Sequence, residues 1–264
     1  MRIATWNINS VRLRARLVSN LLKKENLDIL CLQETKVIDE LFPAEGFKKQ
    51  GYEHIFYSGE KSYNGVCIIS RIPLKLHETK PIVNNDKRHI STEINYAGEK
   101  IILHNFYIPA GGDIPDPIEN PKFRHKLDYN DKMGNYLNKT HDKKDNIIIL
   151  GDFNIAPYEN DVWSHKQLLK IVSHTPIEVE KLLNTKESLE FVDIARKFVD
   201  EKERLYSWWS YRNRDWKKSN RGRRLDHIWC TEPLKNNVKD FSILKEVRDW
   251  KQPSDHVPVI IEIG

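Results

Sequence analysis

The amino-acid sequence predicts an α/β protein built on mixed β-sheets. Strand-like runs occur along the whole chain, and helical patterns lie between many of them. Two strand-like runs meet across Ala97-Gly98, which is typical of a β-hairpin. Strands that alternate with helices, together with hairpins, indicate sheets that mix parallel and antiparallel neighbours. Because no linker interrupts the pattern, we expect residues 1–264 to form one domain.

Each predicted strand is a short run of β-branched, aromatic and aliphatic residues. The run from Ile147 to Leu150 is continuously aliphatic and ends at a glycine, which is typical of a strand covered on both faces. In chain order, the predicted strands cover residues 2–8, 27–33, 52–58, 65–70, 88–96, 100–108, 146–151, 223–230, 240–247 and 256–263.

The predicted helices have apolar residues at three- and four-residue spacing. The first follows Ser10, a candidate N-cap, and carries Val11, Leu17 and Leu21 on its apolar face. The second covers residues 120–139, and two shorter helices are expected at residues 180–183 and 191–198. These segments separate the predicted strands and complete the α/β pattern.

Composition narrows the class of protein. The chain has 264 residues, a net charge of +5 and a pI near 8.9, which is compatible with a polyanionic partner. No apolar run approaches the ~18–20 residues that span a bilayer, so we expect no membrane partner. Only Cys31, Cys67 and Cys230 are present, widely separated and without metal-ligand spacing. This usage suits a reducing, cytoplasmic compartment and argues against a disulfide framework or a zinc site.

Polar side chains recur where predicted strands end. Asp152 and Asn154 follow the aliphatic run of residues 147–150, and residues two apart in an extended segment point the same way. A turn explains this stretch alone equally well. The pattern nevertheless repeats at other strand ends, where the chain places Asn7, Asn9, Glu34, Tyr107, Asp255 and His256.

Asp226 lies inside a mostly apolar strand, where an unpaired carboxylate costs several kcal/mol. It therefore needs a partner, and a histidine is a plausible one. Acids, amides, a histidine and a tyrosine at strand ends suggest a hard-cation site acting on phosphate, and carboxylate oxygens suit Mg²⁺. The sequence contains no P-loop, which argues against nucleotide hydrolysis of that kind.

These segments resemble a known family. "TWNINSVR", "CLQETK", "YIPAGG", "LGDFNIAP", "YSWWSYR", "RGRRLDHI" and "SDHVPV" are similar, in order and spacing, to the exodeoxyribonuclease III branch of the endonuclease/exonuclease/phosphatase superfamily. The resemblance spans nearly the whole chain, and the tryptophan and arginine motifs narrow it to abasic-site DNA repair nucleases. It implies a four-layer sandwich of two packed mixed β-sheets flanked by helices, with the active site at one end.

The resemblance also implies roles for individual residues. It implies Mg²⁺, for which Mn²⁺ can substitute, on Glu34 with Asn7 close by and Asp255 contributing. Asp152 would orient or deprotonate the attacking water, and Asn154 would hold the water or the scissile phosphate. The remaining implied catalytic residues are His256, which would be paired with Asp226 and neutralise the phosphate, and Tyr107 near the leaving oxygen. Which of Asp152, His256 and Tyr107 transfers the proton stays open.

The segment from residue 206 to residue 226 combines tryptophans with cationic side chains. A core strand followed by a solvated basic loop is the alternative to a DNA-facing surface. On the DNA-facing interpretation, Trp208 and Leu225 line a pocket for the base-less sugar, where some relatives place a bulky apolar residue in the position of Arg223. The candidate DNA-binding residues are Trp208, Trp209, Arg212, Trp216, Arg223 and Leu225, within a basic run that also contains Arg214, Lys217, Lys218, Arg221 and Arg224.

The leading hypothesis is therefore a monomeric, Mg²⁺-dependent nuclease that incises double-stranded DNA 5′ to abasic sites and leaves a 3′-hydroxyl. The resemblance also implies 3′–5′ exonuclease and 3′-end-cleaning work on 3′ ends. A phosphatase or lipid phosphodiesterase is a second interpretation, which the basic tryptophan segment disfavours. A non-catalytic nucleic-acid-binding protein is a third, which the full set of polar site residues disfavours. The sequence departs from the family pattern at Ala110, because relatives commonly have a polar side chain at this position.

Overall fold

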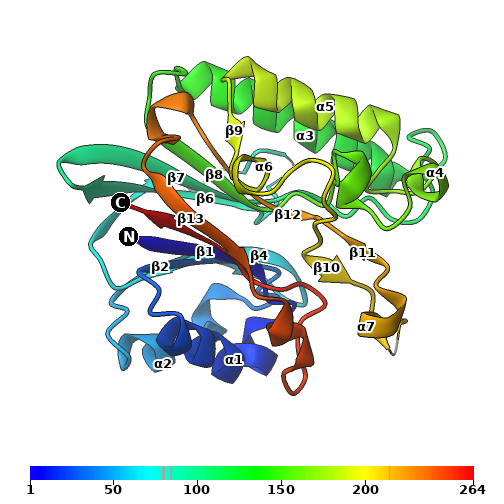
Figure 1. Cartoon of the computed structure of the whole chain (residues 1–264). Helices are drawn as coiled ribbons and strands as arrows, with labels where there is room; N and C mark the ends of the chain where they lie inside the picture. The colour runs from blue at the N-terminus through cyan, green and yellow to red at the C-terminus, as the bar shows by residue number, and fades with distance from the viewer. Residues whose placement is uncertain (79–80, 84, 214) are drawn as a thin grey trace.

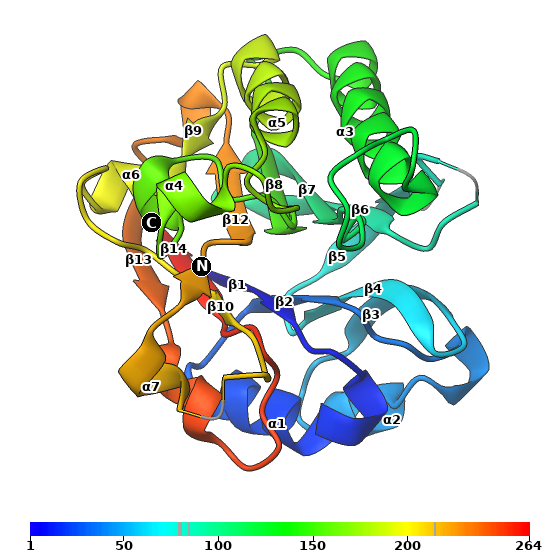
Figure 2. The ribbon, with the colours of Figure 1, turned by 90° about the vertical axis from the view of Figure 1, so that its right-hand side faces the viewer.

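The computed structural model describes residues 1–78, 81–83, 85–213 and 215–264. Two β-sheets pack face to face, and helices cover the outer face of each (Figure 1). Helices α1 (Val11–Lys24) and α2 (Ala44–Lys48) lie on one side, and α3 (Pro121–Thr140) and α5 (Pro176–Ser188) lie on the other. Figure 2, seen from the end of the molecule, shows the resulting order of layers. The expected four-layer α/β sandwich is confirmed.

The first sheet contains the N-terminal and C-terminal strands. Its order is β13-β14-β1-β2-β4-β3, and within it only β1 and β2 run parallel among the described pairs. Its strands are β1 (Arg2–Asn7), β2 (Ile29–Gln33), β3 (His54–Glu60), β4 (Tyr63–Ser70), β13 (Val238–Ile243) and β14 (Val259–Ile263).

The second sheet has the order β5-β6-β7-β8-β12-β9, and its one parallel pair among the described residues is β7 with β8. Its strands are β5 (Leu74–Glu78), β6 (His89–Tyr96), β7 (Glu99–Tyr107), β8 (Ile147–Asp152), β9 (Val192–Asp193) and β12 (Asp226–Cys230). The turn at Ala97-Gly98 joins β6 to β7, as the sequence predicts. A short ribbon of β10 (Trp208–Trp209) and β11 (Gly222–Arg223) stands apart from both sheets.

Several element bounds differ from the sequence prediction. Ser10 occupies the N-cap of α1, as the sequence predicts, although its side chain makes no capping hydrogen bond. The short helix expected at residues 180–183 is the longer α5, and the one expected at residues 191–198 divides into β9 and α6 (Ile194–Phe198). Strand β5 and the short elements α2, α4 (His165–Leu168), α7 (Trp216–Ser219), β10 and β11 were not predicted, because they carry too few periodic apolar residues.

Three apolar layers hold the sandwich together. The central one joins the inner faces of the sheets through residues such as Ile3, Ile68, Leu103 and Ile148. The outer two pack α1 and α2 on the first sheet, and α3 and α5 on the second. Cys31, Cys67 and Cys230 are buried and free. Among the helices of the described residues, not one has the length and apolar character that a membrane crossing demands.

Strand direction brings the polar residues of both sheets to one end. The parallel pair β1–β2 and the parallel pair β7–β8 each end at that edge, carrying Asn7, Glu34, Tyr107 and Asp152. The antiparallel β12 starts there, because Asp226 lies opposite Asp152 in the ladder. Carboxyl ends of parallel strands are where α/β sheets bind ligands, and this structure has two such pairs facing each other.

Candidate active site

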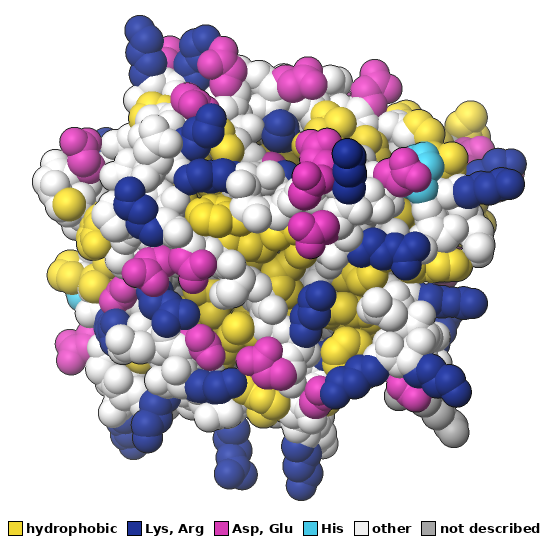
Figure 3. All heavy atoms as spheres, in the orientation of Figure 1, with side chains coloured by type: hydrophobic (Ala, Val, Ile, Leu, Met, Phe, Trp, Pro, Cys, Tyr) yellow, Lys and Arg dark blue, Asp and Glu magenta, His cyan; other side chains and the backbone are white. Residues whose placement is uncertain are grey.

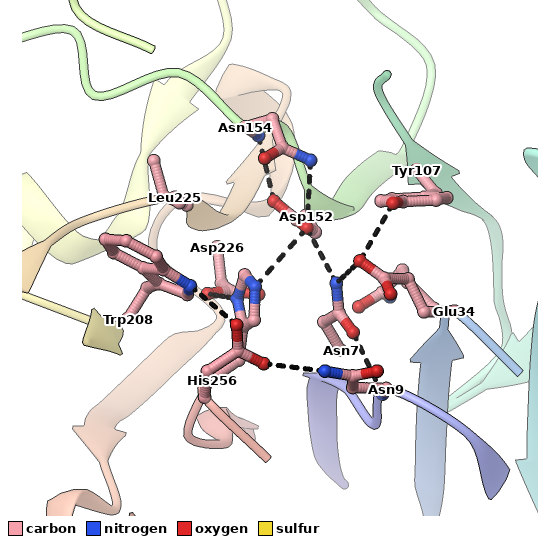
Figure 4. Close-up of polar contacts among 12 residues, drawn as sticks. Asn7, Asn9, Glu34, Tyr107, Asp152, Asn154, Trp208, Leu225, Asp226 and His256 are labelled. Carbon is pink, nitrogen blue, oxygen red and sulfur yellow. Dashed lines mark hydrogen bonds and ion pairs between the residues drawn. The ribbon is translucent and has the colours of Figure 1, made fainter. Parts of the chain in front are cut away.

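Asp152 lies at the centre of a connected hydrogen-bond network (Figure 4). Its side chain is fully buried at the end of β8. One carboxylate oxygen accepts a hydrogen bond from the Asn154 backbone N–H (2.9 Å). The other accepts from the side-chain amides of Asn7 (2.8 Å) and Asn154 (3.0 Å). These donors fix the carboxylate in one orientation.

Where β2 and β8 end, a residue in the left-handed backbone region turns the chain. Glu34 follows β2 with φ 50°, and Asn154 follows β8 with φ 53°. Such φ values are uncommon for residues with a β-carbon, and for glutamate in particular they cost free energy. The turns place the Glu34 carboxylate and the Asn154 amide at the same end of the sandwich instead of continuing along their strands (Figure 4).

Glu34 is bound on both carboxylate oxygens. Its Oε1 accepts hydrogen bonds from the Asn7 amide (2.9 Å) and the Tyr107 hydroxyl (2.8 Å), and its Oε2 pairs with the Lys36 ammonium (2.6 Å). Burial acts to raise the pKa of Glu34, but the Lys36 charge, the hydrogen bonds from Lys36 and Asn7 and the His256 charge together outweigh it and lower that pKa. Burial and then the Glu34 charge raise the pKa of Tyr107 well above its usual value, so Tyr107 is a neutral hydrogen-bond donor.

His256 and Asp226 form the ion pair that the sequence predicts. The Nδ1 of His256 lies 2.8 Å from Asp226 Oδ2, and its Nε2 lies 3.7 Å from Asp152 Oδ2. Burial disfavours the charged imidazole, but the Asp226 and Asp152 carboxylates overcome this and raise the pKa of His256 to about 10. Burial, together with the Asp226 and Glu34 charges, raises the pKa of Asp152 to about 7.

Asp255 connects this network to the tryptophan segment. One oxygen accepts a hydrogen bond from the Asn9 amide (3.1 Å), and the other accepts from the Trp208 indole N–H (3.0 Å). The Asp255 carboxylate therefore anchors Trp208 beside His256 (Figure 4). Trp208 also pairs with His256 through an isolated β-bridge.

The acidic residues fit a divalent cation. Ligand atoms of Asp152, Asp226 and His256 lie within 4.8 Å of one another, and the buried Asp226 Oδ1 has no hydrogen-bond donor among the described residues. The high pKa of His256 makes its imidazole a cation at neutral pH, and a metal ligand must be deprotonated. Glu34, whose pKa is lowered, is therefore the better ligand through its hard carboxylate oxygens. The Asn7 NH₂ group donates hydrogen bonds to the Glu34 and Asp152 carboxylates. Ligation of an ion between them through the Asn7 oxygen therefore requires the amide to flip.

Residues 4–256 match the endonuclease/exonuclease/phosphatase family. The chain belongs to this family. Family members are metal-dependent, and the acidic groups described above agree with that. The resemblance that the sequence motifs indicated is thus confirmed over nearly the whole chain.

Relatives place this family member among DNA repair nucleases. It is 30% identical to exodeoxyribonuclease III of Haemophilus influenzae, with 99% of each chain covered. It superposes with a TM-score of 0.91 on an AP endonuclease from Archaeoglobus fulgidus at 34% identity, covering 100% of this chain and 99% of the other. A Neisseria 3′ phosphatase bound to a product DNA hairpin gives a TM-score of 0.88 at 30% identity, with 100% and 99% covered. The chain is therefore a nuclease.

The predicted DNA-binding residues of this family member do not all face solvent. Trp209 is only 1% exposed and packs with Tyr206, Val257 and Trp216, so it has no surface to offer DNA and its predicted contact is wrong. Trp208 is half-buried and packs with Leu225 in a cluster that also contains Trp163. The structure thus brings the two predicted pocket residues together.

Arginines of the basic segment divide between core and surface. Arg223 lies over the Trp208 ring (5.3 Å) and donates hydrogen bonds to the Val172 carbonyl and the Ser173 hydroxyl. Arg224 is fully buried between Asp161 and Asp193, so it holds the fold together. Arg214 lies outside the described residues. Exposed members of the segment are Arg212, Lys217, Lys218 and Arg221, and dark blue side chains gather over the region of β11 and α7 in Figure 3.

Some residues that hold the site residues in place through hydrogen bonds were not predicted from the sequence. Ser207 donates a hydrogen bond to Asp226 Oδ2 (2.7 Å), and the buried Lys126, paired with Glu178, donates to the Asn154 carbonyl (2.8 Å). Arg221 lies over the Trp163 ring (4.7 Å) next to the Trp208 cluster. A lysine on the apolar side of a helix was the one signal available for Lys126, and nothing in the sequence distinguished Ser207.

Proposed function

We propose that this nuclease is a Mg²⁺-dependent DNA repair phosphodiesterase that acts in the cytoplasm as a monomer with a single domain. It cuts duplex DNA 5′ to an abasic site and leaves a 3′-hydroxyl, and it also removes nucleotides and blocking groups from 3′ ends. The observation that carries the proposal is the convergence of Glu34, Asp152 and the Asp226–His256 pair in one network at one end of the sandwich. The DNA-acting relatives support it.

Asp152 orients and deprotonates the attacking water in this proposal. A general base works best when its pKa lies near the operating pH, and the pKa of Asp152 is raised to about 7. The Asn154 and Asn7 amides hold the carboxylate without adding charge. Since Asn154 Nδ2 also donates to the Ile108 carbonyl (2.9 Å), the amide is fixed beside the place where water and phosphate meet.

His256 and Tyr107 stabilise the charge that develops during cleavage. The protonated imidazole of His256 has Asp226 on one nitrogen and presents the other toward Asp152, so it can donate to a phosphate oxygen there. Tyr107 is neutral and donates toward Glu34, and the same hydroxyl can turn to the leaving oxygen. His256 acts as a fixed donor, which requires little reorganisation as charge accumulates.

Glu34 is the principal residue that would hold the Mg²⁺, with Asn7 and Asp255 as further oxygen donors. The bound ion supplies positive charge next to the phosphate. Without the ion, the Lys36 ammonium neutralises the Glu34 carboxylate, and Asn9 and Trp208 donate hydrogen bonds to the Asp255 carboxylate. These contacts keep the carboxylates in position before the ion binds.

Trp208, Leu225 and Trp163 form a packed group, called the tryptophan cluster below, that selects the damaged nucleotide. An abasic nucleotide turns out of the helix at lower cost because no base pair has to be broken. Trp208 and Leu225 pack together beside Asp255 and can enclose a bare sugar, whereas a nucleotide with its base collides with them. Arg223 narrows this pocket from the side by lying over Trp208, and Arg212 and Trp216 contact the DNA backbone around it.

The proposal is tested with two DNA duplexes, one containing a single tetrahydrofuran abasic analogue and one undamaged with a recessed 3′ end. Each is incubated with Mg²⁺ or with a chelator, and the products are resolved by length. We expect metal-dependent incision 5′ to the analogue and digestion of the recessed end. Incision that persists in chelator, or cleavage on the 3′ side of the analogue, contradicts the proposal.

Two variants locate the activity in the described site. Glu34→Gln and Asp152→Asn should each lower kcat by about 10²–10³-fold, the loss typical of removing one electrostatic group from an active site. Glu45→Gln on α2 is the matched control because its exposed carboxylate contacts only Lys48 among the described residues. Full activity in Glu34→Gln or Asp152→Asn shows that the chemistry takes place elsewhere.

A further inference from the structure

A second group of imidazoles lies on the other side of the second sheet from the active site. It consists of His77 on β5, His89 on β6, His104 on β7 and His141 directly after α3. His104 precedes Tyr107 by three positions on β7, so the two side chains point to opposite faces of the sheet. This group, which we call the histidine cluster, therefore belongs to the helix-covered face and has no part in the proposed cleavage.

The two central imidazoles meet nitrogen to nitrogen. His104 Nε2 lies 2.9 Å from His141 Nε2, with ring centroids 4.9 Å apart and ring planes at 81°. Imidazole nitrogens bind metals at about 2.0–2.1 Å, so two adjacent ligands of one ion lie about 2.9 Å apart at a right angle and about 3.3 Å apart in a tetrahedron. The observed separation is that of two adjacent ligands. Without a metal, one Nε2 must carry a hydrogen and donate it to the other.

On its opposite nitrogen, the His104 ring has a hydrogen-bond partner and the His141 ring faces a carboxylate beyond hydrogen-bond distance. His104 Nδ1 lies 3.0 Å from His89 Nε2, and His141 Nδ1 lies 4.0 Å from an Asp145 carboxylate oxygen. Metal-ligating histidines almost always donate a hydrogen bond from the second nitrogen, which fixes the ring and the position of its hydrogen, and His104 has such a partner in His89. When His141 carries its hydrogen on Nδ1, facing Asp145, its Nε2 lone pair is free to bind an ion.

His77 supplies a third imidazole from an accessible position. It is exposed at a β-bulge in β5, and bulges often redirect a side chain. Its ring centroid lies 6.5 Å from that of His104 and 6.3 Å from that of His141. His77 and His141 both line a surface pocket of about 370 Å³, through which an ion can enter. Glu99 and Asp145 also line the pocket, together with two lysines, Lys144 and Lys100, of which Lys100 is paired with Glu93.

We propose that His77, His104 and His141 bind one late first-row divalent metal ion, of the class to which Zn²⁺ belongs, at a site separate from the catalytic centre. Imidazole nitrogens select such ions over Mg²⁺, which prefers oxygen. The exposed His77 ring, whose centroid lies 6.5 Å from that of His104 and 6.3 Å from that of His141, has to move toward this pair to supply the third nitrogen. The bound ion links β5, β7 and the end of α3, which lie far apart in the sequence.

The test is calorimetric titration of Zn²⁺ into metal-stripped protein. The background is the double variant Glu34→Gln/Asp152→Asn, which weakens zinc binding by the catalytic carboxylates. This background should retain one zinc site, and adding His77→Ala and His141→Gln should weaken that site at least about tenfold. His54→Ala, which removes a half-buried histidine on β3 of the other sheet, is the matched control and should leave it unchanged. Circular dichroism checks that each variant is folded.

Electron paramagnetic resonance with Cu²⁺ on the same background gives an independent reading. Nitrogen hyperfine splitting should report three imidazoles, and fewer once His77 and His141 are replaced. Zinc affinity that is unchanged by those replacements, or a copper spectrum showing at most one nitrogen, overturns the proposal. Because both measurements use a background that lacks the Glu34 and Asp152 carboxylates, a failure here leaves the proposed nuclease function untouched.

Discussion

At the level of single residues, the active site depends on how buried charges balance one another. Asp226 and His256 are both nearly fully buried, and an isolated charge at either position costs several kcal/mol. As an ion pair in contact at 2.8 Å, each stabilises the charged form of the other. Ser207 adds a hydrogen bond to the same carboxylate oxygen, so Asp226 is held toward the imidazole.

Replacing Asp226 by asparagine should lower the pKa of His256. The carboxylates raise that pKa to about 10 from an ordinary 6.5, so the protonated imidazole stabilises the fold fully below pH 6.5. This stabilisation is lost as the pH rises through about 10. In metal-free Asp226→Asn, NMR titration of the His256 ring should show a pKa at least about one unit lower than in the unsubstituted protein. Identical titration curves contradict the assigned ion pair.

Replacing Trp208 by alanine should relax discrimination against nucleotides that still have their base. The indole packs with Leu225 and is held by Asp255, so its loss enlarges the proposed pocket. The kcat/KM for the abasic duplex divided by the kcat/KM for the intact duplex should fall. The fold-change of this ratio should exceed the fold-change of the Mg²⁺ concentration that gives half-maximal activity. An unchanged ratio excludes Trp208 from the pocket.

At the level of elements, the active site requires β7 and β8 to run side by side up to their last residues. Gly151 has φ 137° and lies opposite Phe106 in the parallel ladder. A β-carbon built at Gly151 comes within 1.9 Å of the Phe106 carbonyl oxygen, which belongs to the backbone and cannot move aside without breaking the ladder. The glycine before Asp152 is therefore required by the close approach of β7.

Gly151→Ala should reduce the free energy of unfolding by about 3 kcal/mol or more, because the clash and the unfavourable φ act together. Gly46→Ala is the matched control. A β-carbon at Gly46 meets nothing within 4 Å, and alanine favours helix α2 by up to about 1 kcal/mol. Urea denaturation of both variants measures the difference. Equal stability of the two variants contradicts the described packing of β7 against β8.

The sequence predicts elements well where burial dictates composition. Ile147 to Leu150 is covered on both faces, so every position had to be apolar and the strand was recognisable. Asp226 allowed a similar prediction of its ion pair, because a carboxylate in an apolar strand requires a partner. The two-residue strands β10 and β11 left no such pattern, and Trp209 looked like a DNA contact because composition does not reveal which face of a short strand is buried. Likewise, His104 and His141 meet only through the tertiary fold.

At the level of the whole molecule, charge is distributed so that one surface can meet a polyanion. The net charge is only +5, yet Arg212, Lys217, Lys218 and Arg221 are exposed within ten consecutive residues next to the tryptophan cluster. Among the acidic groups of the candidate active site, Asp152 and Asp226 are buried and Glu34 and Asp255 are half-buried, and the Asn7 amide donates hydrogen bonds to Glu34 and Asp152. DNA can therefore approach the basic segment without meeting the carboxylates as a repulsive surface.

Arg212→Ala with Lys218→Ala should weaken binding to duplex DNA in a salt-dependent way. Each phosphate contact releases counterions and contributes about 0.9 to the slope of log Kd against log salt concentration, so losing both contacts should reduce that slope by about two. Fluorescence anisotropy at several salt concentrations, with Ca²⁺ in place of Mg²⁺ to suppress cleavage, measures it. Lys75→Ala on the edge strand β5 is the control, since this exposed lysine lies outside the basic segment. A slope that stays the same in the double variant means that DNA binds along a different surface, and the tryptophan cluster then cannot be the pocket that receives the abasic sugar.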